Sequence, residues 1–257
     1  MKDDPATRLI EHLPFTTEKV IAARARIGVV VLASDYTIEH ELRKMVTLPG
    51  VDIYHARIKN SPEITPDTLR AMGPLITETA ELILPGDTLD VLAFACTSAS
   101  IVLGTDTVAT KLNAAKPEAK TTNPAHAAFT AFRALGARRI AVLTPYSASV
   151  NAFVQKSVEE AGFDVPVFGS FNEPLDPVVA AIDTASLKSA IARITSEAAV
   201  DAVFISCTSV RIADAVAEIE ADLGIPVTSS NHALAWHCLR LAGIDDKLPH
   251  LGRLFTV

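Results

Sequence analysis

The chain has 257 residues, a formal net charge of −7 and 49% hydrophobic residues, with only 5% aromatic residues. This length accommodates one large domain or two small ones, and the apolar content is sufficient for a buried core. The negative charge and the lack of a basic run in the sequence argue against a nucleic-acid-binding surface, because phosphate binding requires clustered Lys and Arg. Small molecules are therefore the expected partners.

The sequence also argues against a membrane-spanning or secreted chain. Even the apolar stretch VLAFACTSASIVLG is shorter than the roughly 18 to 20 residues of a membrane helix, and hydroxyl side chains interrupt it. The first residues, MKDDPATRLIEHLPF, carry acids and a proline where a secretory signal has a basic start and an apolar core. We therefore expect a cytoplasmic protein. Its three cysteines, an odd number in a reducing compartment, are expected to be free thiols.

Four continuous apolar runs are typical of strands that are buried on both faces of a parallel sheet. In chain order they cover residues 27–33, 90–95, 139–144 and 201–206. Helix-period stretches lie between them, for example TPDTLRAMGPLITETAELIL, where Thr65 is placed to cap a helix and Pro66 occupies its first position. This βαβα order favours parallel sheets with right-handed crossovers, in which ligands bind beyond the carboxyl ends of the strands.

The two halves of the chain contain similar sequences in the same order. LDVLAFACTSASI (residues 89–101) aligns without gaps with VDAVFISCTSVRI (residues 200–212). TTNPAHAAFTAFRALG (residues 121–136) similarly matches TSSNHALAWHCLRLAG (residues 228–243). An internal repeat of this kind indicates two copies of one α/β unit.

We therefore predict an α/β fold with two pseudo-symmetric, Rossmann-like (flavodoxin-like) half-domains and an active-site cleft between their parallel sheets. The N-terminal half-domain is expected to cover residues 1–123, and the C-terminal half-domain residues 124–229. The C-terminal segment, residues 230–257, is expected to pack on the first half-domain. The sequence permits a homo-oligomer but does not define its size.

Polar loops follow the four predicted strands and are expected to converge at residues 33–39, 95–100, 144–151 and 206–211. Cys96 and Cys207 each stand in a Cys-Thr-Ser sequence that ends a strand and is expected to open a helix. The free N–H groups and the dipole at a helix N-terminus favour negative charge, so both thiols are expected to have a lowered pKa. Two such thiols can face one substrate from opposite sides.

Opposed thiols are suited to racemisation or isomerisation. Inverting a carbon acid requires one group that removes a proton and a second group that delivers one from the opposite face, and two cysteines can exchange these roles. Cis-trans isomerisation can use the same pair, with one thiolate adding to the double bond and the other thiol acting as the acid. Neither route requires a metal or an organic cofactor, and we expect none.

The candidate residues also have purely structural interpretations. A single cysteine at a strand end is most often a small core residue, and only the duplicated context favours chemistry for Cys96 and Cys207. Cys238 lacks that context and is expected in the core. Three histidines lack the spacing of metal ligands, so no metal site is expected from them: His126, His232 and His237.

At the loops the chain resembles the aspartate/glutamate racemase superfamily, and within it the branch of maleate cis-trans isomerases and arylmalonate decarboxylases. The resemblance covers nearly the full length and rests on ACTS (95–98), TPY (144–146), SC (206–207) and the closing GIPVTSSNHALAWHCLRLAG. It implies two Rossmann-like half-domains, no cofactor, and Cys96 and Cys207 as the catalytic pair. It further implies a set of residues that bind carboxylate or enediolate oxygens: Thr97, Ser98, Tyr146 and Thr208.

The first loop departs from the maleate isomerase pattern. Maleate isomerase-like members carry Ser-Ser-Asn, whose asparagine binds a substrate carboxylate, where this sequence has Ala33-Ser34-Asp35. A carboxylate side chain repels a second substrate carboxylate and favours an amine or a hydroxyl, so Ser34 and Asp35 are expected to bind a polar substituent. Asp35 also fits an ordinary helix cap. The string ASDYTIEHEL and the chain ending most resemble the arylmalonate-decarboxylase-like proteins associated with ectoine utilisation.

The leading hypothesis is a cofactor-independent isomerase or racemase that acts on a small carboxylate, such as an amino, acylamino or dicarboxylic acid. The second is a carbon-carbon lyase in which Cys207 protonates an enediolate after loss of carbon dioxide. Decarboxylase-like members have glycine at the position of Cys96, which makes the lyase the second choice. The third is a two-lobed protein that binds a small molecule without turnover. Residues 169–176 are expected to influence specificity.

Overall fold

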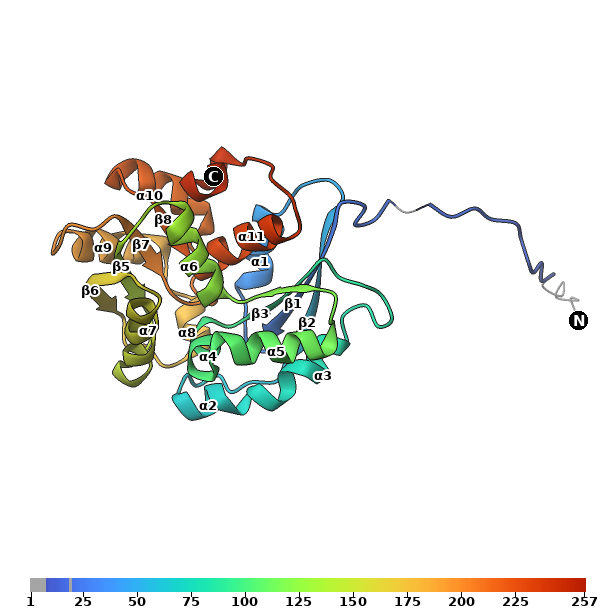
Figure 1. The fold of residues 1–257 in the computed structure, drawn as a ribbon, viewed down its shortest axis with the longest axis horizontal. Helices are drawn as coiled ribbons and strands as arrows, with labels where there is room; N and C mark the ends of the chain where they lie inside the picture. The colour runs from blue at the N-terminus through green and yellow to red at the C-terminus, as the bar shows by residue number, and fades with distance from the viewer. Residues whose placement is uncertain (1–7, 19) are drawn as a thin grey trace, which may run out of the picture.

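The computed structural model describes residues 8–18 and 20–257, whose body contains two four-stranded parallel sheets (Figure 1). The first sheet has the order β2-β1-β3-β4, formed by Val51–Ile58, Ala25–Leu32, Val91–Ala95 and Lys120–Thr122. The second has the order β6-β5-β7-β8, formed by Asp164–Ser170, Arg139–Thr144, Ala202–Ile205 and Val227–Ser229. All paired strands are parallel. The matching strand order confirms the predicted α/β fold with two pseudo-symmetric, Rossmann-like halves.

The four predicted strands are the central ones, β1, β3, β5 and β7, and nearly all of their residues are buried. The edge strands β2 and β6 are mostly half-buried instead. A strand with one covered face needs no continuous apolar run, which is why these two strands have mixed sequences. Burial of the central strands supplies the hydrophobic core that holds each sheet.

Helices flank both sheets. Those up to residue 134 are α1 (Ile38–Met45), α2 (Pro66–Ala71), α3 (Ile76–Glu81), α4 (Thr97–Leu103), α5 (Thr105–Ala115) and α6 (Pro124–Ala134). Those that follow are α7 (Ala148–Glu160), α8 (Asp176–Ala180), α9 (Thr184–Thr195), α10 (Val216–Leu223) and α11 (Ser230–Leu241). As predicted, Thr65 caps α2, with a reciprocal capping box to Thr68. The helical stretch is then interrupted by a 3-10 turn at Gly73–Leu75, because Pro74 has no N–H and its ring clashes with the preceding turn.

Two helices cross between the halves. α6 follows β4 of the first sheet, yet its Phe132 packs edge-to-face against Phe163 and Phe204 of the second half, with ring centroids 5.1 and 5.5 Å apart. α11 follows β8 of the second sheet, yet it contacts α1, β3 and β4 of the first half. The two helices also pack against each other, between the two sheets (Figure 1). Each sheet therefore receives a helix from the other half of the chain.

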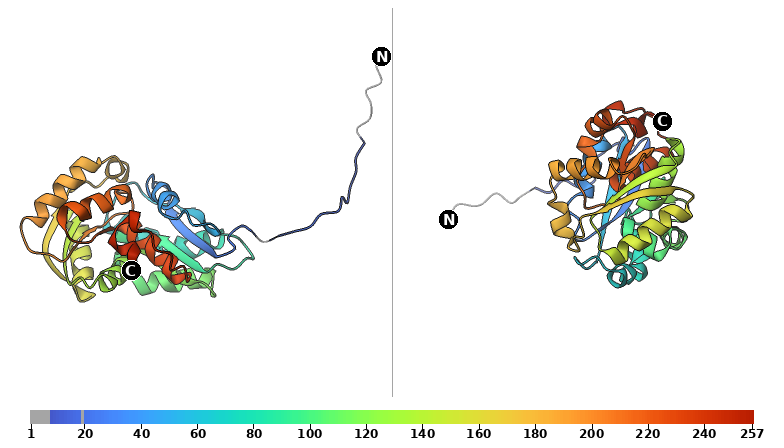
Figure 2. Two further views of the ribbon diagram at one scale, coloured as in Figure 1. Left: turned by 90° about the horizontal axis from the view of Figure 1, so that it is seen from above. Right: turned by 90° about the vertical axis from the view of Figure 1, so that its left-hand side faces the viewer.

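We propose that the half-domains divide near residues 123 and 229, as expected from the sequence, with these two helices as the crossing points. The last residues form two 3-10 turns, Pro249–Leu251 and Arg253–Thr256, which contact α10 and β8 of the second half as well as α11. His232 of α11 is hydrogen-bonded through Nε2 to the carbonyl of Leu251 over 2.7 Å. The C-terminal segment therefore lies against both halves, which appear as two lobes from above (Figure 2).

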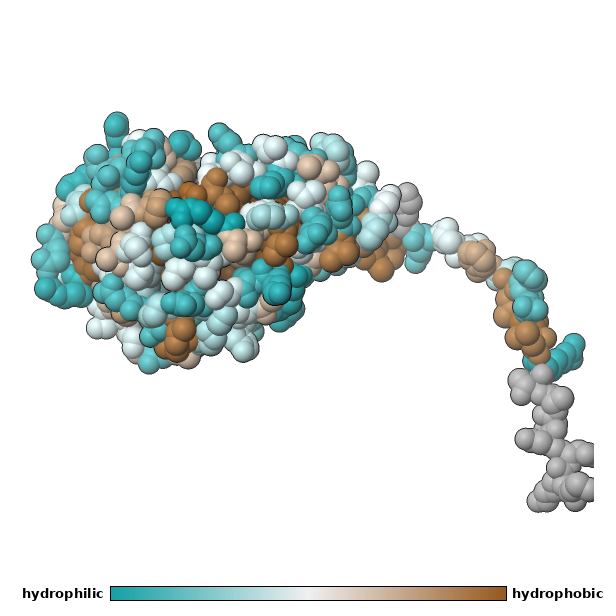
Figure 3. All heavy atoms as spheres, turned by 90° about the horizontal axis from the view of Figure 1, so that it is seen from below, coloured by the Kyte–Doolittle hydropathy of each residue, from teal (hydrophilic) through white to brown (hydrophobic). Residues whose placement is uncertain are grey.

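The described residues that precede β1 extend away from this body (Figures 1 and 2). Their exposed side chains include Leu9, Ile10, Leu13 and Phe15, and hydrophobic atoms are visible along this segment (Figure 3). Within residues 8–18 and 20–257, none of the helices combines the length and the apolar character that crossing a bilayer requires.

Candidate active site

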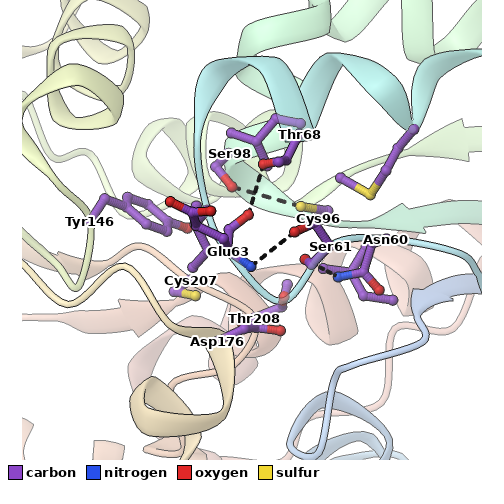
Figure 4. A pocket seen from close by; sticks show the side chains of 14 residues that line it. Asn60, Ser61, Glu63, Thr68, Cys96, Ser98, Tyr146, Asp176, Cys207 and Thr208 are labelled. Atoms are coloured by element: carbon purple, nitrogen blue, oxygen red, sulfur yellow. Dashed lines mark hydrogen bonds between the residues drawn. The ribbon is translucent and has the colours of Figure 1, made fainter.

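The loops at the carboxyl ends of the central strands meet around one cavity (Figure 4). Cys96 comes from the loop after β3, Tyr146 from the loop after β5, and Cys207 and Thr208 from the loop after β7. The structure therefore places both cysteines, one from each half, in the wall of the same cavity. The remaining lining residues are Leu32, Asn60, Ser61, Glu63, Ile64, Thr68, Leu69, Met72, Ser98 and Asp176.

Cys96 occupies the start of a helix, as predicted. It has an extended backbone, φ −146° and ψ 114°, and is the N-cap residue of α4. Its Sγ lies 3.7 Å from the Ser98 hydroxyl, within the range of a weak hydrogen bond. The Ser100 hydroxyl donates to the Cys96 carbonyl over 2.6 Å. These contacts hold the thiol against the first turn of α4.

The prediction that Cys207 also opens a helix is wrong. In a helix, the carbonyls of Thr208 and Ser209 would accept from the N–H groups of Ile212 and Ala213. Here the Thr208 carbonyl accepts from Asn231 over 2.8 Å and the Ser209 carbonyl from the Thr37 hydroxyl over 2.8 Å. The N–H groups of residues 212 and 213 donate to the Glu41 carboxylate instead, over 2.7 and 2.6 Å. Side chains at the start of α1 and in α1 and α11 thus satisfy the backbone hydrogen-bonding groups of this loop, and it stays non-helical.

Burial raises the pKa of both cysteine thiols, so the predicted lowering of the pKa is also wrong. The pKa of Cys96 is raised to about 12, chiefly by burial, against the opposing effects of the Ala99 N–H and the Ser98 hydroxyl. The pKa of Cys207 is raised by burial and then by the charge of Asp176. Loss of hydration outweighs any helix dipole here. Both residues are therefore protonated thiols at neutral pH in the ligand-free protein.

Tyr146 and Thr208, both predicted to bind oxygen atoms, are buried in the cavity wall. The Tyr146 carbonyl accepts from Ser170 over 2.6 Å and from Asn151 over 2.9 Å, which anchors its loop. Burial raises the pKa of the Tyr146 phenol, which lies next to Cys207. Its hydroxyl is therefore protonated and can donate a hydrogen bond to a substrate oxygen.

Three other predicted substrate-binding residues do not line the cavity. Asp35 accepts through Oδ1 from the N–H groups of Thr37 and Ile38 over 2.6 and 2.8 Å, and thereby caps the start of α1. Ser34 donates to Asp176 over 2.6 Å. The Thr97 hydroxyl donates to Ser230 over 2.7 Å and so joins α4 to α11. Ser34 and Asp35 stand behind the cavity wall, where they support the residues that form it.

Asp176 is the main lining residue that sequence reasoning missed. It is only 3% exposed, and its carboxylate accepts hydrogen bonds from the Ser34 and Ser209 hydroxyls, one from each half. The segment 169–176 was expected to influence specificity, but an Asp before Pro at a helix start has the same pattern as an ordinary cap. The sequence analysis also missed Asn60, which donates to the Ser34 hydroxyl over 2.8 Å.

Two segments from opposite halves pair beside the cavity. Glu63 and Leu175 form an isolated antiparallel bridge. The Ile64 N–H donates to the Pro174 carbonyl and the Asp176 N–H donates to the Pro62 carbonyl, each over 3.0 Å. The labelled side chains of Ser61 and Glu63 lie near that of Cys96 in Figure 4. This pairing joins the cavity wall of one half to that of the other.

The histidines and the third cysteine serve packing. In the part of the chain that the structure describes, no group of three or more His, Cys, Asp or Glu side chains is arranged to hold a metal ion. His237 is hydrogen-bonded through Nδ1 to the Thr122 hydroxyl over 2.8 Å, and the ring of His126 lies 5.2 Å from it. Cys238 of α11 is buried in the hydrophobic core of the protein and does not line the cavity.

Replacing Glu41 by alanine is expected to lower the free energy of unfolding by about 3–5 kcal/mol, because three buried N–H donors would lose their acceptor. The carboxylate binds the N–H groups of Ile212 and Ala213 and, over 2.7 Å, the Asn231 side chain that holds the Thr208 carbonyl. Urea denaturation measures the change. Glu160→Ala is the matched control, since its carboxylate is exposed and pairs with the exposed Lys156, and should cost at most about 1 kcal/mol. Equal losses in both variants would contradict the role of Glu41.

Asp35→Asn is expected to stabilise the protein at pH 8 by about 1–3 kcal/mol and to have little effect at pH 4. Burial raises the pKa of Asp35 from 3.8 to about 6, and its Oδ2 has no partner among the described residues. A raised pKa in the folded state stabilises the protonated form, so this contribution is present below pH 3.8 and is lost as the pH rises through about 6. Asparagine keeps the capping oxygen without the charge. Urea denaturation at both pH values tests this, and a pH-independent difference would contradict it.

The fold and the cavity together define a class: two-lobed α/β proteins in which each half supplies a cysteine to one shared cavity. The chain belongs to the arylmalonate decarboxylase family, whose family model matches residues 63–255. This confirms the resemblance to the branch of maleate isomerases and arylmalonate decarboxylases in the aspartate/glutamate racemase-like superfamily. The link to ectoine utilisation stays a prediction.

Individual relatives represent both activities of that branch. The maleate isomerase of Pseudomonas putida is 26% identical over 243 residues, which are 90% of this chain and 97% of that protein. The arylmalonate decarboxylase of Bordetella bronchiseptica is 37% identical over 126 residues, which are 48% of this chain and 52% of that protein. One solved structure is a cysteine-to-serine variant of Nocardia farcinica maleate cis-trans isomerase with a covalently bound succinylcysteine intermediate. It has a TM-score of 0.80 and 26% identity, covering 90% of this chain and 98% of that chain.

Proposed function

We propose that this protein is a cofactor-independent isomerase or racemase that acts on a small carboxylate through Cys96 and Cys207. The observation that carries the proposal is the position of the two thiols, on equivalent loops of the two halves and in the wall of one cavity. The succinylcysteine intermediate of the Nocardia enzyme supports a cysteine that bonds to substrate carbon in a relative of the same fold.

The neighbours of the thiols fit both routes of reaction. In racemisation, one thiolate removes the proton of the carbon acid and the opposite thiol delivers a proton to the other face. In cis-trans isomerisation, one thiolate bonds to an alkene carbon, the other thiol protonates the adjacent carbon, and the same steps in reverse follow rotation about the single bond. The Ser98 and Tyr146 hydroxyls and the Thr208 loop would bind the carboxylate or enediolate oxygens. Either route requires that one thiol first loses its proton.

The test is incorporation of solvent deuterium into a panel of amino, acylamino and dicarboxylic acids, followed by NMR. Cysteine-dependent exchange or geometric isomerisation by the wild type, lost in Cys96→Ala and Cys207→Ala, is the expected result. Binding of a ligand without turnover, unchanged when either cysteine becomes serine, would instead favour a non-catalytic binding protein.

A carbon-carbon lyase is the second candidate, because the matching family model is that of arylmalonate decarboxylases. Here Cys207 would protonate the enediolate that remains after carbon dioxide leaves, and Cys96 would not be needed for the proton transfer. Release of carbon dioxide from malonate-type acids, retained in Cys96→Ala, would decide for this reaction.

We also propose a cytoplasmic location, since the buried thiols of residues 96, 207 and 238 are all free and both catalytic routes require reduced cysteines. The exposed apolar side chains before β1 support a homo-oligomer. Light scattering coupled to size-exclusion chromatography of the full chain would measure its mass in solution.

A further inference from the structure

We infer that Asp176 determines substrate specificity, and that it selects an acid with a protonated amino group. This inference rests on the proposed function of the two cysteines, because it places the amino group in the cavity that they line. It narrows the substrate class from small carboxylates in general to amino acids.

Asp176 is a buried carboxylate without a cationic partner. It is 3% exposed, and its hydrogen bonds come from two neutral hydroxyls, those of Ser34 and Ser209. Among the fourteen lining residues there is no Lys, Arg or His, and no ion pair between described residues includes Asp176. A carboxylate has about four lone-pair sites, so two sites remain for a ligand. A buried anion is strongly unfavourable unless a cation is paired with it, and a substrate ammonium group would supply that cation.

A second buried carboxylate, behind the wall of the cavity, adds negative charge on the same side as Asp176. Asp35 is buried beside Asp176 and Thr208, and its Oδ2 has no hydrogen-bond partner among the described residues. This negative charge disfavours a second substrate carboxylate, as a dicarboxylic acid would have, and favours an ammonium group.

The opposite part of the cavity suits the carboxylate of the same substrate. Ser98 and Tyr146 present neutral hydroxyl groups in its wall, close to the two thiols and away from the side where Asp176 and Thr208 lie (Figure 4). A zwitterionic amino acid therefore finds donors at one side of the cavity and an unpaired carboxylate at the other. A hydroxy acid of the same shape would lose only the charge pairing with Asp176.

An ammonium group at Asp176 would also favour catalysis. The charge of Asp176 raises the pKa of both thiols, and at Cys207 it is the largest effect after burial. A bound ammonium group offsets that charge, so one thiol can ionise more readily in the complex than in the empty cavity. The amino group would thus contribute to binding and to formation of the thiolate.

A purely structural role for Asp176 makes a different prediction. If Asp176 only links the Ser34 and Ser209 hydroxyls by hydrogen bonds, an amide can replace the carboxylate, because an amide accepts from one hydroxyl and donates to the other. Asp176→Asn therefore keeps the hydrogen-bonded link between the two serines and removes the charge. Glu63→Gln is the matched control, because it removes one charge from an exposed lining residue where water and salt screen it.

The experiment measures calorimetric binding and solvent-deuterium exchange for the L and D forms of the common amino acids, each beside its 2-hydroxy acid. The wild type is expected to bind at least one amino acid about 30-fold or more tightly than its hydroxy acid, with the preference lost in Asp176→Asn and kept in Glu63→Gln. Equal affinity for the two acids, a preference that survives in Asp176→Asn, or no binding of any amino acid would overturn the inference. Amino-acid binding with the expected preference but without cysteine-dependent exchange would leave Asp176 as the selecting residue and remove the proposed function. Cysteine-dependent exchange only in the hydroxy acids would support the proposed function and overturn the inference about Asp176.

Discussion

Cys207→Ala is expected to reduce turnover of the substrate at least about a thousandfold, because the reaction loses a group that transfers a proton or bonds to carbon at one face. Cys207 lies in the cavity between Tyr146 and Thr208, and the structure offers no other thiol on that loop. Chiral chromatography or NMR measures the rate. In the lyase reaction the same variant should also be inactive, since the enediolate then has no proton donor.

A folding defect would have to be distinguished from a chemical one. Cys207 is 4% exposed, so its replacement leaves a small void in the core as well as a missing thiol. Cys238→Ala is the matched control, because that thiol is equally buried at 3% exposure and lies outside the cavity. We expect Cys238→Ala to lose a similar amount of stability and to keep its activity. Full turnover by Cys207→Ala would exclude a catalytic role for this residue.

Cys96→Ala is expected to lower the rate of racemisation about a thousandfold or more and to retain hydrogen exchange from one enantiomer. Cys207 can still remove and return a proton at its own face, and solvent deuterium can replace that proton. The expected NMR result is deuterium in one enantiomer only, without inversion. An enzyme that works by adding a thiol to a double bond would not catalyse this one-sided hydrogen exchange, because a saturated acid has no double bond to which the thiol can add.

The outcome for Cys96→Ala therefore separates the three reactions. One-sided exchange supports proton transfer, retained decarboxylation supports the lyase, and loss of every activity supports thiol addition with Cys96 as an essential partner. Exchange from both enantiomers would contradict the two-face arrangement, because a single thiol cannot reach both faces of a held substrate.

The sequence was sufficient to predict the central part of the fold. Continuous apolar runs identify β1, β3, β5 and β7, since these strands are covered on both faces and every position contributes to burial. The edge strand β2, with the sequence VDIYHARI, has only half-buried residues in its middle and carries no comparable signal. The internal repeat could be recognised in the sequence because its matching segments contain central strands and the cysteine loops that follow them.

The candidate site was predictable where a residue's position follows from its own strand. Cys96, Tyr146 and Cys207 come directly after central strands and all line the cavity. The shape of the loop after Cys207 depends on Glu41 and Asn231, which are far away in the sequence, so local reasoning wrongly continued it as a helix. The raised thiol pKa values likewise depend on burial by the other half. Asp176 was missed because its inferred role depends on the absence of a cationic partner among the described residues, and that absence becomes visible only in three dimensions.

The exchange of α6 and α11 between the halves has a consequence for folding. Neither sequence repeat can complete its core alone, because Phe132 belongs to the first repeat and its ring packs against Phe163 and Phe204 of the second. The two lobes should therefore melt in a single calorimetric transition, and a chain cut at the repeat boundary should yield fragments that gain structure only when mixed. A protein with one copy of the repeat could have formed the same cavity as a helix-swapped dimer, with two identical thiols related by a twofold axis.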